Sequence, residues 1–175
     1  MWKNIHKYYT PWLDVLTFVI MIGMFSFVVF SYGSIPTEIP IQFNVAGEAI
    51  GWENKSLLYG LIVINFNVIV LCFILNYFLI IRSDEKVNGF YLINMPFIKG
   101  KKLSTEKIHL VKKNSARMFA VLNLMLSILF GMIYYNLIQG GLGNQGTLGS
   151  AIGVIIVLIL IIMFYFVRKI YQDMK

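Results

Sequence analysis

Few residues of the chain are of types that carry out chemistry, and their spacing matches no common catalytic or metal-binding pattern. The two histidines, His6 and His109, lie far apart in the sequence, and Cys72 is the only cysteine. There is no H-E-x-x-H motif, no G-x-S-x-G motif and no glycine-rich phosphate loop. We therefore expect neither an enzyme nor a bound metal ion or other cofactor. Cys72 is expected to be a small apolar residue within the fold.

The composition is that of an integral membrane protein. Hydrophobic residues make up 58% of the 175 residues, charged residues make up 13%, and the mean hydropathy is +0.75. Such a chain has too little polar surface to cover a water-soluble globule.

Four apolar runs are long enough to cross a hydrocarbon layer of about 30 Å as helices, which takes about 20 residues each. They cover residues 13–32, 57–81, 118–138 and 148–167. The runs are apolar on every face, whereas spanning strands alternate apolar and polar residues. The predicted fold is therefore an all-α transmembrane four-helix bundle that forms a single domain over residues 1–175.

The distribution of charge predicts the orientation of this bundle. Every Lys and Arg except Lys55 falls in the N-terminal segment, in residues 82–117 or in the C-terminal tail. The positive-inside rule then places both termini and the 82–117 loop in the cytoplasm, and residues 33–56 outside. The net charge of +7 is accounted for by this topology and by anionic lipid, and we expect no nucleic-acid partner.

The outer segment 33–56 contains the pattern of a short β-structure. Apolar residues alternate with polar residues or proline from Ile39 to Val45, which is the period of a half-buried strand. Gly47 can supply the positive φ of a tight reversal, and Gly51 permits close approach of a neighbouring strand. We expect a second extended piece over residues 49–52. The segment is thus predicted to be an ordered lid between the first two helices.

The residues of this lid resemble a known family. Pro40, Phe43-Asn44, Gly47 and Gly51-Trp52 follow one another at the spacing typical of a bacterial domain-of-unknown-function membrane family. That family forms the first two helices and the intervening loop of SdpI-type immunity proteins, which protect a toxin producer from its own membrane-active peptide. The resemblance implies a bacterial cytoplasmic-membrane protein in which Pro40, Phe43, Gly47 and Gly51 specify the outer loop.

Polar residues also occur inside the predicted helices. Asn65, Asn67, Asn76 and Asn123 can hydrogen-bond across helices, and packing is the role we expect for them. The alternative is that Asn65 and Asn67 line a polar cavity. These two residues are about 200° apart on a helix, which argues against one shared site. Asp14 lies near the cytoplasmic end of the first helix, where we expect a hydrated carboxylate.

Two further motifs bear on packing and partners. Gly149 and Gly153 form a Gly-x-x-x-Gly motif that lets helices approach closely, either inside the bundle or in a homodimer. Residues 104–117 read as a short basic amphipathic helix, suited to the membrane surface or to a cytoplasmic regulator.

Three functions remain open from the sequence. The preferred one is binding and protection, in which the outer loop engages a membrane-active peptide or an envelope component through Gln42, Asn44, Glu48 and Trp52. The second is an accessory or sensor subunit of a membrane complex, such as an ABC transporter or a regulator-sequestering system. The third is a small transporter, for which the lack of a mid-membrane charge is unfavourable.

Overall fold

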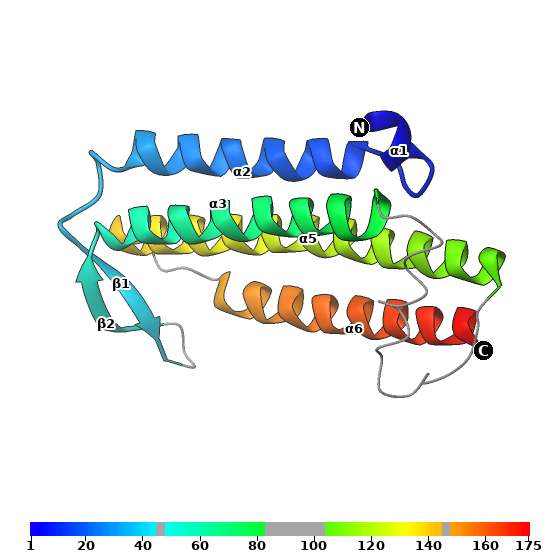
Figure 1. Cartoon of the computed structure of the whole chain (residues 1–175). Coiled ribbons are helices and arrows are strands. Elements are labelled where there is room, and N and C mark those ends of the chain that lie inside the picture. Colours follow the sequence, from blue (N-terminus) through cyan, green and yellow to red (C-terminus); the bar gives the residue numbers. More distant parts are fainter. Residues whose placement is uncertain (45–47, 83–103, 145–147) are drawn as a thin grey trace.

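The computed structural model describes residues 1–44, 48–82, 104–144 and 148–175. It consists mainly of long helices that run side by side, with a small β-hairpin at one end (Figure 1). Both chain termini lie at the other end. We call these the hairpin end and the terminal end.

Four helical segments are long and apolar enough to cross a membrane. They are α2 (Trp12–Ser31), α3 (Leu57–Leu75) continued by the π-helix η1 (Asn76–Ile81), α5 (Thr105–Gly141) and α6 (Leu148–Met174). Their length and composition indicate a multi-pass membrane protein. The predicted spans 13–32 and 57–81 agree with the structure to within one residue, whereas α5 begins well before the predicted span 118–138 and α6 continues past the predicted end at residue 167. The helix α5 is central, since α2, α3 and α6 all pack against it.

The predicted basic helix at residues 104–117 is not a separate element on the membrane surface. It is the first part of α5, which has 37 residues and is therefore about 56 Å long at 1.5 Å per residue. Its apolar side is already covered, because Val111 packs against Ile170 and Met174 of α6. The two helices therefore extend together beyond the length needed to cross a bilayer.

The N-terminal segment is folded, which the sequence pattern did not predict. The short helix α1 (Trp2–His6) is followed by a turn that packs Tyr8 and Tyr9 against the terminal end of the helices. Ile5 joins the same cluster, which includes Ile81 and Ala116. Burial of these side chains holds the segment in place.

The outer lid is an antiparallel hairpin of β1 (Glu38–Phe43) and β2 (Ala49–Asn54). It confirms the expected pair of extended segments, although β2 continues two residues further than predicted. The register shifts on either side of Gln42, which pairs with Gly51. A Cβ at Gly51 would meet the Gln42 side chain at 3.0–3.1 Å, so glycine permits this close pairing. The expected turn at Gly47 lies outside the described residues.

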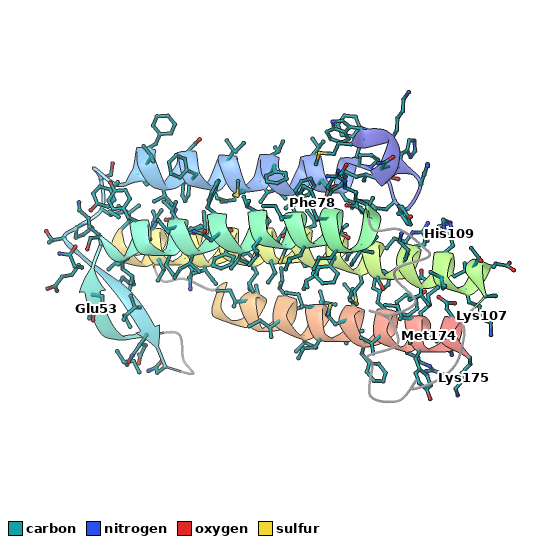
Figure 2. The ribbon with its side chains drawn as sticks, viewed as in Figure 1. Glu53, Phe78, Lys107, His109, Met174 and Lys175 are labelled. Carbon is teal, nitrogen blue, oxygen red and sulfur yellow. The ribbon has the colours of Figure 1, made fainter. Side chains whose placement is uncertain are left out.

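The hairpin is fixed to the helices by a buried apolar contact and by a partly buried cation. Ile39 is fully buried against Gly141 at the end of α5, where an added Cβ would lie 3.0 Å from the Ile39 Cγ2 atom. The Lys55 Nζ atom donates to the carbonyl oxygens of Tyr32 and Ile35, each at 3.0 Å, and lies over the Tyr32 ring. Figure 2 shows Glu53 at this end and Lys107, His109 and Lys175 at the opposite end.

The helix α6 lies at the periphery. Its most apolar stretch of 18 residues has no buried residue, and α5 is the helix it packs against most. A Cβ added at Gly153 would meet nothing within 4 Å, so this glycine makes no close packing contact with the described residues. The side-chain environment of Gly149 lies outside the described residues.

Candidate functional site

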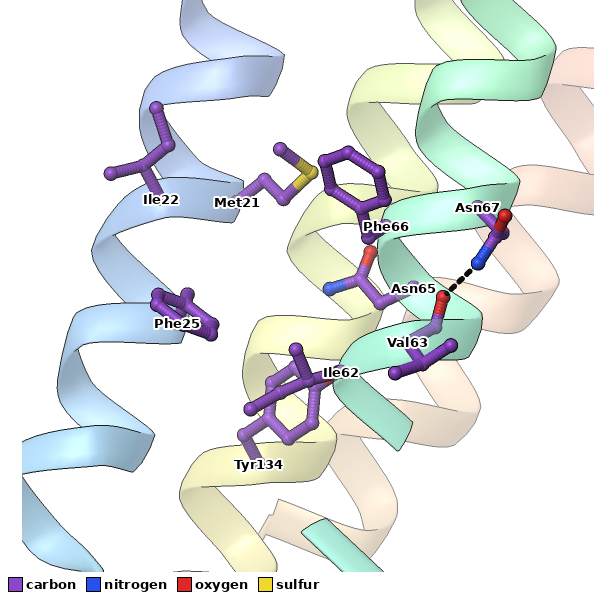
Figure 3. Close-up of a pocket in the computed structure, with 9 residues that line it drawn as sticks. All are labelled: Met21, Ile22, Phe25, Ile62, Val63, Asn65, Phe66, Asn67 and Tyr134. Carbon is purple, nitrogen blue, oxygen red and sulfur yellow. Dashed lines mark hydrogen bonds between the residues drawn. The ribbon is translucent and has the colours of Figure 1, made fainter. Parts of the chain in front are cut away.

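A lateral cavity opens between α2 and α3 in the half of the helices nearer the hairpin (Figure 3). Its volume is about 340 Å³. The walls are almost entirely apolar and consist of Met21, Ile22, Phe25, Ile62, Val63 and Phe66, with Asn65, Asn67 and Tyr134 as the polar residues. Several wall residues face outward, including Ile22 and Phe66, so the cavity opens toward the hydrocarbon layer.

The cavity exists because α2 and α3 each pack mainly against α5 and make fewer contacts with each other. The α2 helix approaches α5 at Gly131, where an added Cβ would lie 3.2 Å from Met24 side-chain atoms. Near the middle of the span, the Ser127 hydroxyl donates to the Thr17 carbonyl oxygen at 3.1 Å. These contacts hold α2 on α5 and leave the space between α2 and α3 open.

The helix α3 is held on α5 by an amide. The Asn123 Nδ2 atom donates to the carbonyl oxygen of Ile69 at 3.2 Å. Asn123 therefore lies where interhelical packing was expected. Its Oδ1 atom is buried and has no hydrogen-bond partner among the described residues.

The inner wall of the cavity carries two buried polar groups. Asn65 is 4% exposed and Tyr134 is 1% exposed. The Tyr134 hydroxyl lies beside the Asn65 side chain, but neither this hydroxyl nor the Asn65 Oδ1 atom has a partner in hydrogen-bond geometry within the described chain. In hydrocarbon, a polar group without a partner costs about 1–3 kcal/mol or more. The wall therefore offers an acceptor and a hydroxyl to a ligand.

Asn67 lies at the rim of the same cavity. Its Nδ2 atom donates to the Val63 carbonyl oxygen of its own helix at 2.7 Å (Figure 3). Asn65 is buried and Asn67 is exposed, so the two side chains lie on different faces of α3 as their angular separation predicts, and the cavity extends from the inner wall to the exposed rim. Among the described residues, Asn67 does not bridge two helices.

The four residues proposed from the sequence for recognition lie on the hairpin, away from this cavity. The Asn44 Nδ2 atom donates to Glu48 Oε2 at 2.7 Å, and the Glu48 backbone N–H donates to Asn44 Oδ1 at 2.9 Å. This pair closes the hairpin loop. Gln42 is exposed beside Gly51, and Trp52 is 52% exposed. Gln42, Glu48 and Trp52 are thus all exposed, and Glu48 is also bonded to Asn44.

The hairpin and the cavity are joined by one apolar cluster. Ile39 of β1, Leu58 of α3 and Tyr134 of α5 are all fully buried members of it. The hydroxyl of Tyr134 lies at the cavity and its ring lies in the cluster under the hairpin. A ligand in the cavity would therefore contact a residue that also supports the lid.

A second buried polar group lies at the terminal end. The Tyr9 hydroxyl donates to Asp14 Oδ2 at 2.9 Å and accepts from Asn76 Nδ2 at 3.1 Å. Asn76 also donates to the Ala116 carbonyl oxygen, at 3.2 Å, and begins the π-helix η1. The expectation of a hydrated Asp14 is wrong, because the N-terminal segment folds over it and leaves it 4% exposed. Burial raises the pKa of the Tyr9 phenol, and the charge of Asp14 raises it further.

The remaining chemistry-bearing residues are scattered. Among the described residues, no group of three or more His, Cys, Asp or Glu side chains is placed to hold a metal ion. Cys72 is partly buried in α3 and is a free thiol.

The sequence analysis identified Asn65 as a residue that could line a polar cavity, but it missed Tyr134. A tyrosine well inside an apolar span is a usable signal for such a site, because its hydroxyl needs a hydrogen-bond partner there.

Comparison with known proteins gives a match between part of the chain and one protein family. No curated protein and no solved structure matches the chain significantly. The predicted resemblance to a domain-of-unknown-function family is confirmed for one part of the chain, which contains the hairpin, most of α2 and the first half of α3. Residues 19–66 match the family described as "Domain of unknown function (DUF1648)".

Proposed function

We propose that the protein binds a membrane-active amphipathic peptide from within the bilayer and thereby protects the membrane that contains it. The observation that carries this proposal is the lateral cavity, which opens toward lipid and ends at the Asn65 Oδ1 atom and the Tyr134 hydroxyl, neither of which has a hydrogen-bond partner in the described part of the chain. The resemblance of the lid to that of SdpI-type immunity proteins supports the same class of ligand.

The chemistry of the inner wall favours a peptide over a hydrocarbon chain. The Asn65 Oδ1 atom can only accept a hydrogen bond, whereas the Tyr134 hydroxyl can donate one. A free peptide group supplies one N–H and one carbonyl oxygen, which matches this pair. Such groups occur in extended peptides and at helix ends, where backbone groups have no partner in their own helix. The apolar walls then take an adjoining side chain.

The hairpin is the second part of the proposed binding surface. Trp52 and Gln42 are exposed on it, and the fold fixes their backbone through Ile39 and Lys55. A surface that is already ordered loses less conformational entropy when a ligand binds. In the proposed arrangement, the hairpin contacts the water-exposed part of the peptide while the cavity receives the membrane-embedded part.

This role requires the hairpin to face the outside of a bacterial cytoplasmic membrane, with both termini in the cytoplasm. The proposal rests on the positive-inside rule, since only Lys55 among the basic residues lies near the hairpin. In a Cys72→Ser background, cysteines at Ser34 and Asn144 should react with an impermeant maleimide added to intact cells. A cysteine at Ser104 should react only after the cells are permeabilised, and the reverse pattern would contradict the orientation.

The binding role can be tested with a pair of matched variants. Val63 lines the cavity and is 60% exposed, while Val157 lies on α6, is 54% exposed and does not line the cavity. A Val63→Trp substitution should occupy the cavity mouth, and Val157→Trp places the same side chain in lipid elsewhere. The purified protein in nanodiscs is titrated with a panel of fluorescent amphipathic membrane-active peptides, with lipid-only nanodiscs as the blank.

We expect at least one peptide to bind the wild type above the blank. Its affinity should fall at least about tenfold in Val63→Trp and stay unchanged in Val157→Trp. Equal binding by the two variants, or no peptide bound above the blank, would contradict the proposed function.

A further inference from the structure

A second cavity lies at the terminal end of the molecule, between the N-terminal segment and helices α2, α5 and α6. Its volume is about 410 Å³. Its lining divides by chemistry into a basic group and an apolar group. The basic residues are His6, Lys7, Lys113 and Arg117, and the apolar residues include Leu13, Val121 and Phe166.

The two kinds of lining follow one another along α5. Lys113, Arg117 and Val121 are spaced four residues apart and so form one stripe, with about 6 Å between successive residues along the helix axis. The helix α5 runs from the terminal end toward the hairpin end. The stripe therefore passes from basic to apolar in the direction in which the helix enters the hydrocarbon layer.

The cavity lies at the depth of a membrane–water boundary. Trp12 precedes the cavity residue Leu13 and is 73% exposed. An exposed tryptophan at the end of a spanning helix is typical of the headgroup layer. The basic half of the cavity then faces the headgroups and the apolar half faces the acyl chains.

The positive charge in the cavity is not neutralised by the described part of the protein. Lys7, Lys113 and Arg117 form no ion pair with any described residue. The Arg117 Nε atom donates to the Tyr8 carbonyl oxygen at 3.0 Å. This bond fixes the guanidinium group and leaves its two terminal amino groups for another acceptor, and a phosphate is the acceptor that suits this geometry.

We propose that this cavity binds the phosphate of an anionic phospholipid, with the glycerol and the start of the acyl chains against Leu13, Val121 and Phe166. A free phosphate would use the same basic residues, but it would leave the apolar half of the cavity without a function. The proposal is independent of the peptide-binding role, because no residue lines both cavities.

The test uses the full-length protein in a neutral detergent and measures binding by native mass spectrometry and by isothermal titration. The ligands are dioctanoyl phosphatidylglycerol, dioctanoyl phosphatidylcholine and inorganic phosphate. The test variant is Lys113→Gln with Arg117→Gln. The control is Lys107→Gln with Arg168→Gln, which removes the same charge from basic residues of α5 and α6 that do not line the cavity.

We expect phosphatidylglycerol to bind more tightly than phosphatidylcholine, and its affinity to fall about ten- to thirty-fold in the test variant and less than about threefold in the control. Because Arg117 also bonds to Tyr8, a Lys7→Gln, Lys113→Gln variant repeats the test without touching that bond. Equal losses in test and control variants would show an unspecific charge effect and overturn the site. Inorganic phosphate that binds as tightly as phosphatidylglycerol would overturn its assignment to a lipid.

Discussion

The same chemical change at two buried tyrosines should lower stability at one of them and not at the other. Tyr9→Phe removes a hydroxyl that donates to Asp14 and accepts from Asn76. Tyr134→Phe removes a hydroxyl that is buried at the inner wall of the lateral cavity and has no hydrogen-bond partner among the described residues. Each substitution leaves the aromatic ring in place, so packing is conserved in both.

The magnitudes follow from the partners of each hydroxyl. A hydrogen bond to a charged group contributes about 1.5–3 kcal/mol, so Tyr9→Phe should lower the free energy of unfolding by about 2 kcal/mol. Removal of a partnerless buried hydroxyl should leave stability unchanged or raise it by up to about 1 kcal/mol. With a shift of about 2–4 °C per kcal/mol for a chain of this size, Tyr9→Phe should melt roughly 4–8 °C below wild type.

The assay is thermal unfolding in detergent, followed by intrinsic fluorescence and by loss of the monodisperse peak in size-exclusion chromatography. Tyr134→Phe should melt at or up to roughly 4 °C above the wild-type temperature. It should also weaken binding of the peptide that the wild type binds. If Tyr134→Phe destabilised the protein as much as Tyr9→Phe does, the Tyr134 hydroxyl would have a partner in the folded chain, and the argument for a ligand at this wall would be refuted.

Three further predictions concern packing and pH. Gly141→Val should lower the free energy of unfolding by about 1–3 kcal/mol because its side chain would overlap the hairpin. Gly153→Val, in open space, should be neutral or slightly stabilising, and equal melting temperatures for the two variants would contradict the docking of the hairpin. Ser127→Ala should lower the free energy of unfolding by only about 0.6 kcal/mol, which is the average for hydrogen bonds between membrane helices. A loss above about 2 kcal/mol, measured by denaturant titration, would contradict this small contribution. The raised pKa of Tyr9 means that the folded state keeps a proton that the unfolded state loses above a pH of about 10. The free energy of unfolding should therefore fall above that pH by up to about 1.4 kcal/mol per pH unit. This decline should be shallower in Tyr9→Phe.

The spanning helices could be predicted closely because hydrocarbon leaves the chain little choice. Each run of about 20 apolar residues must satisfy its backbone within a helix, so a helix covers each predicted run, and α5 and α6 continue past their runs at the terminal end. The first and second predicted spans, at residues 13–32 and 57–81, differ from the structure by one residue or less. The alternation from Ile39 onward identified β1, although burial does not follow it strictly, since Ile39 and Pro40 are both buried and Gln42 is exposed.

Features that depend on tertiary contacts could not be predicted. Helix α1 has five residues and no periodic pattern, and it is held in place by contacts with residues more than 70 positions away. The same contacts bury Asp14, which the sequence places at a hydrated boundary. The lateral cavity depends on α2 and α3 being separated by their common attachment to α5, and no local pattern reports that separation.

The central claim is that a membrane-active peptide enters the cavity between α2 and α3, and photocrosslinking tests it most directly. Phe66 lines the cavity, whereas Phe164 lies exposed on α6 and does not. Each is replaced in turn by benzoylphenylalanine, a phenylalanine with a photoreactive ketone, in cells that are then exposed to the peptide that binds the purified protein. We predict a covalent adduct of protein and peptide, identified by mass, at position 66 and none at position 164. Adducts of equal yield at both positions, or at position 164 alone, would contradict the account.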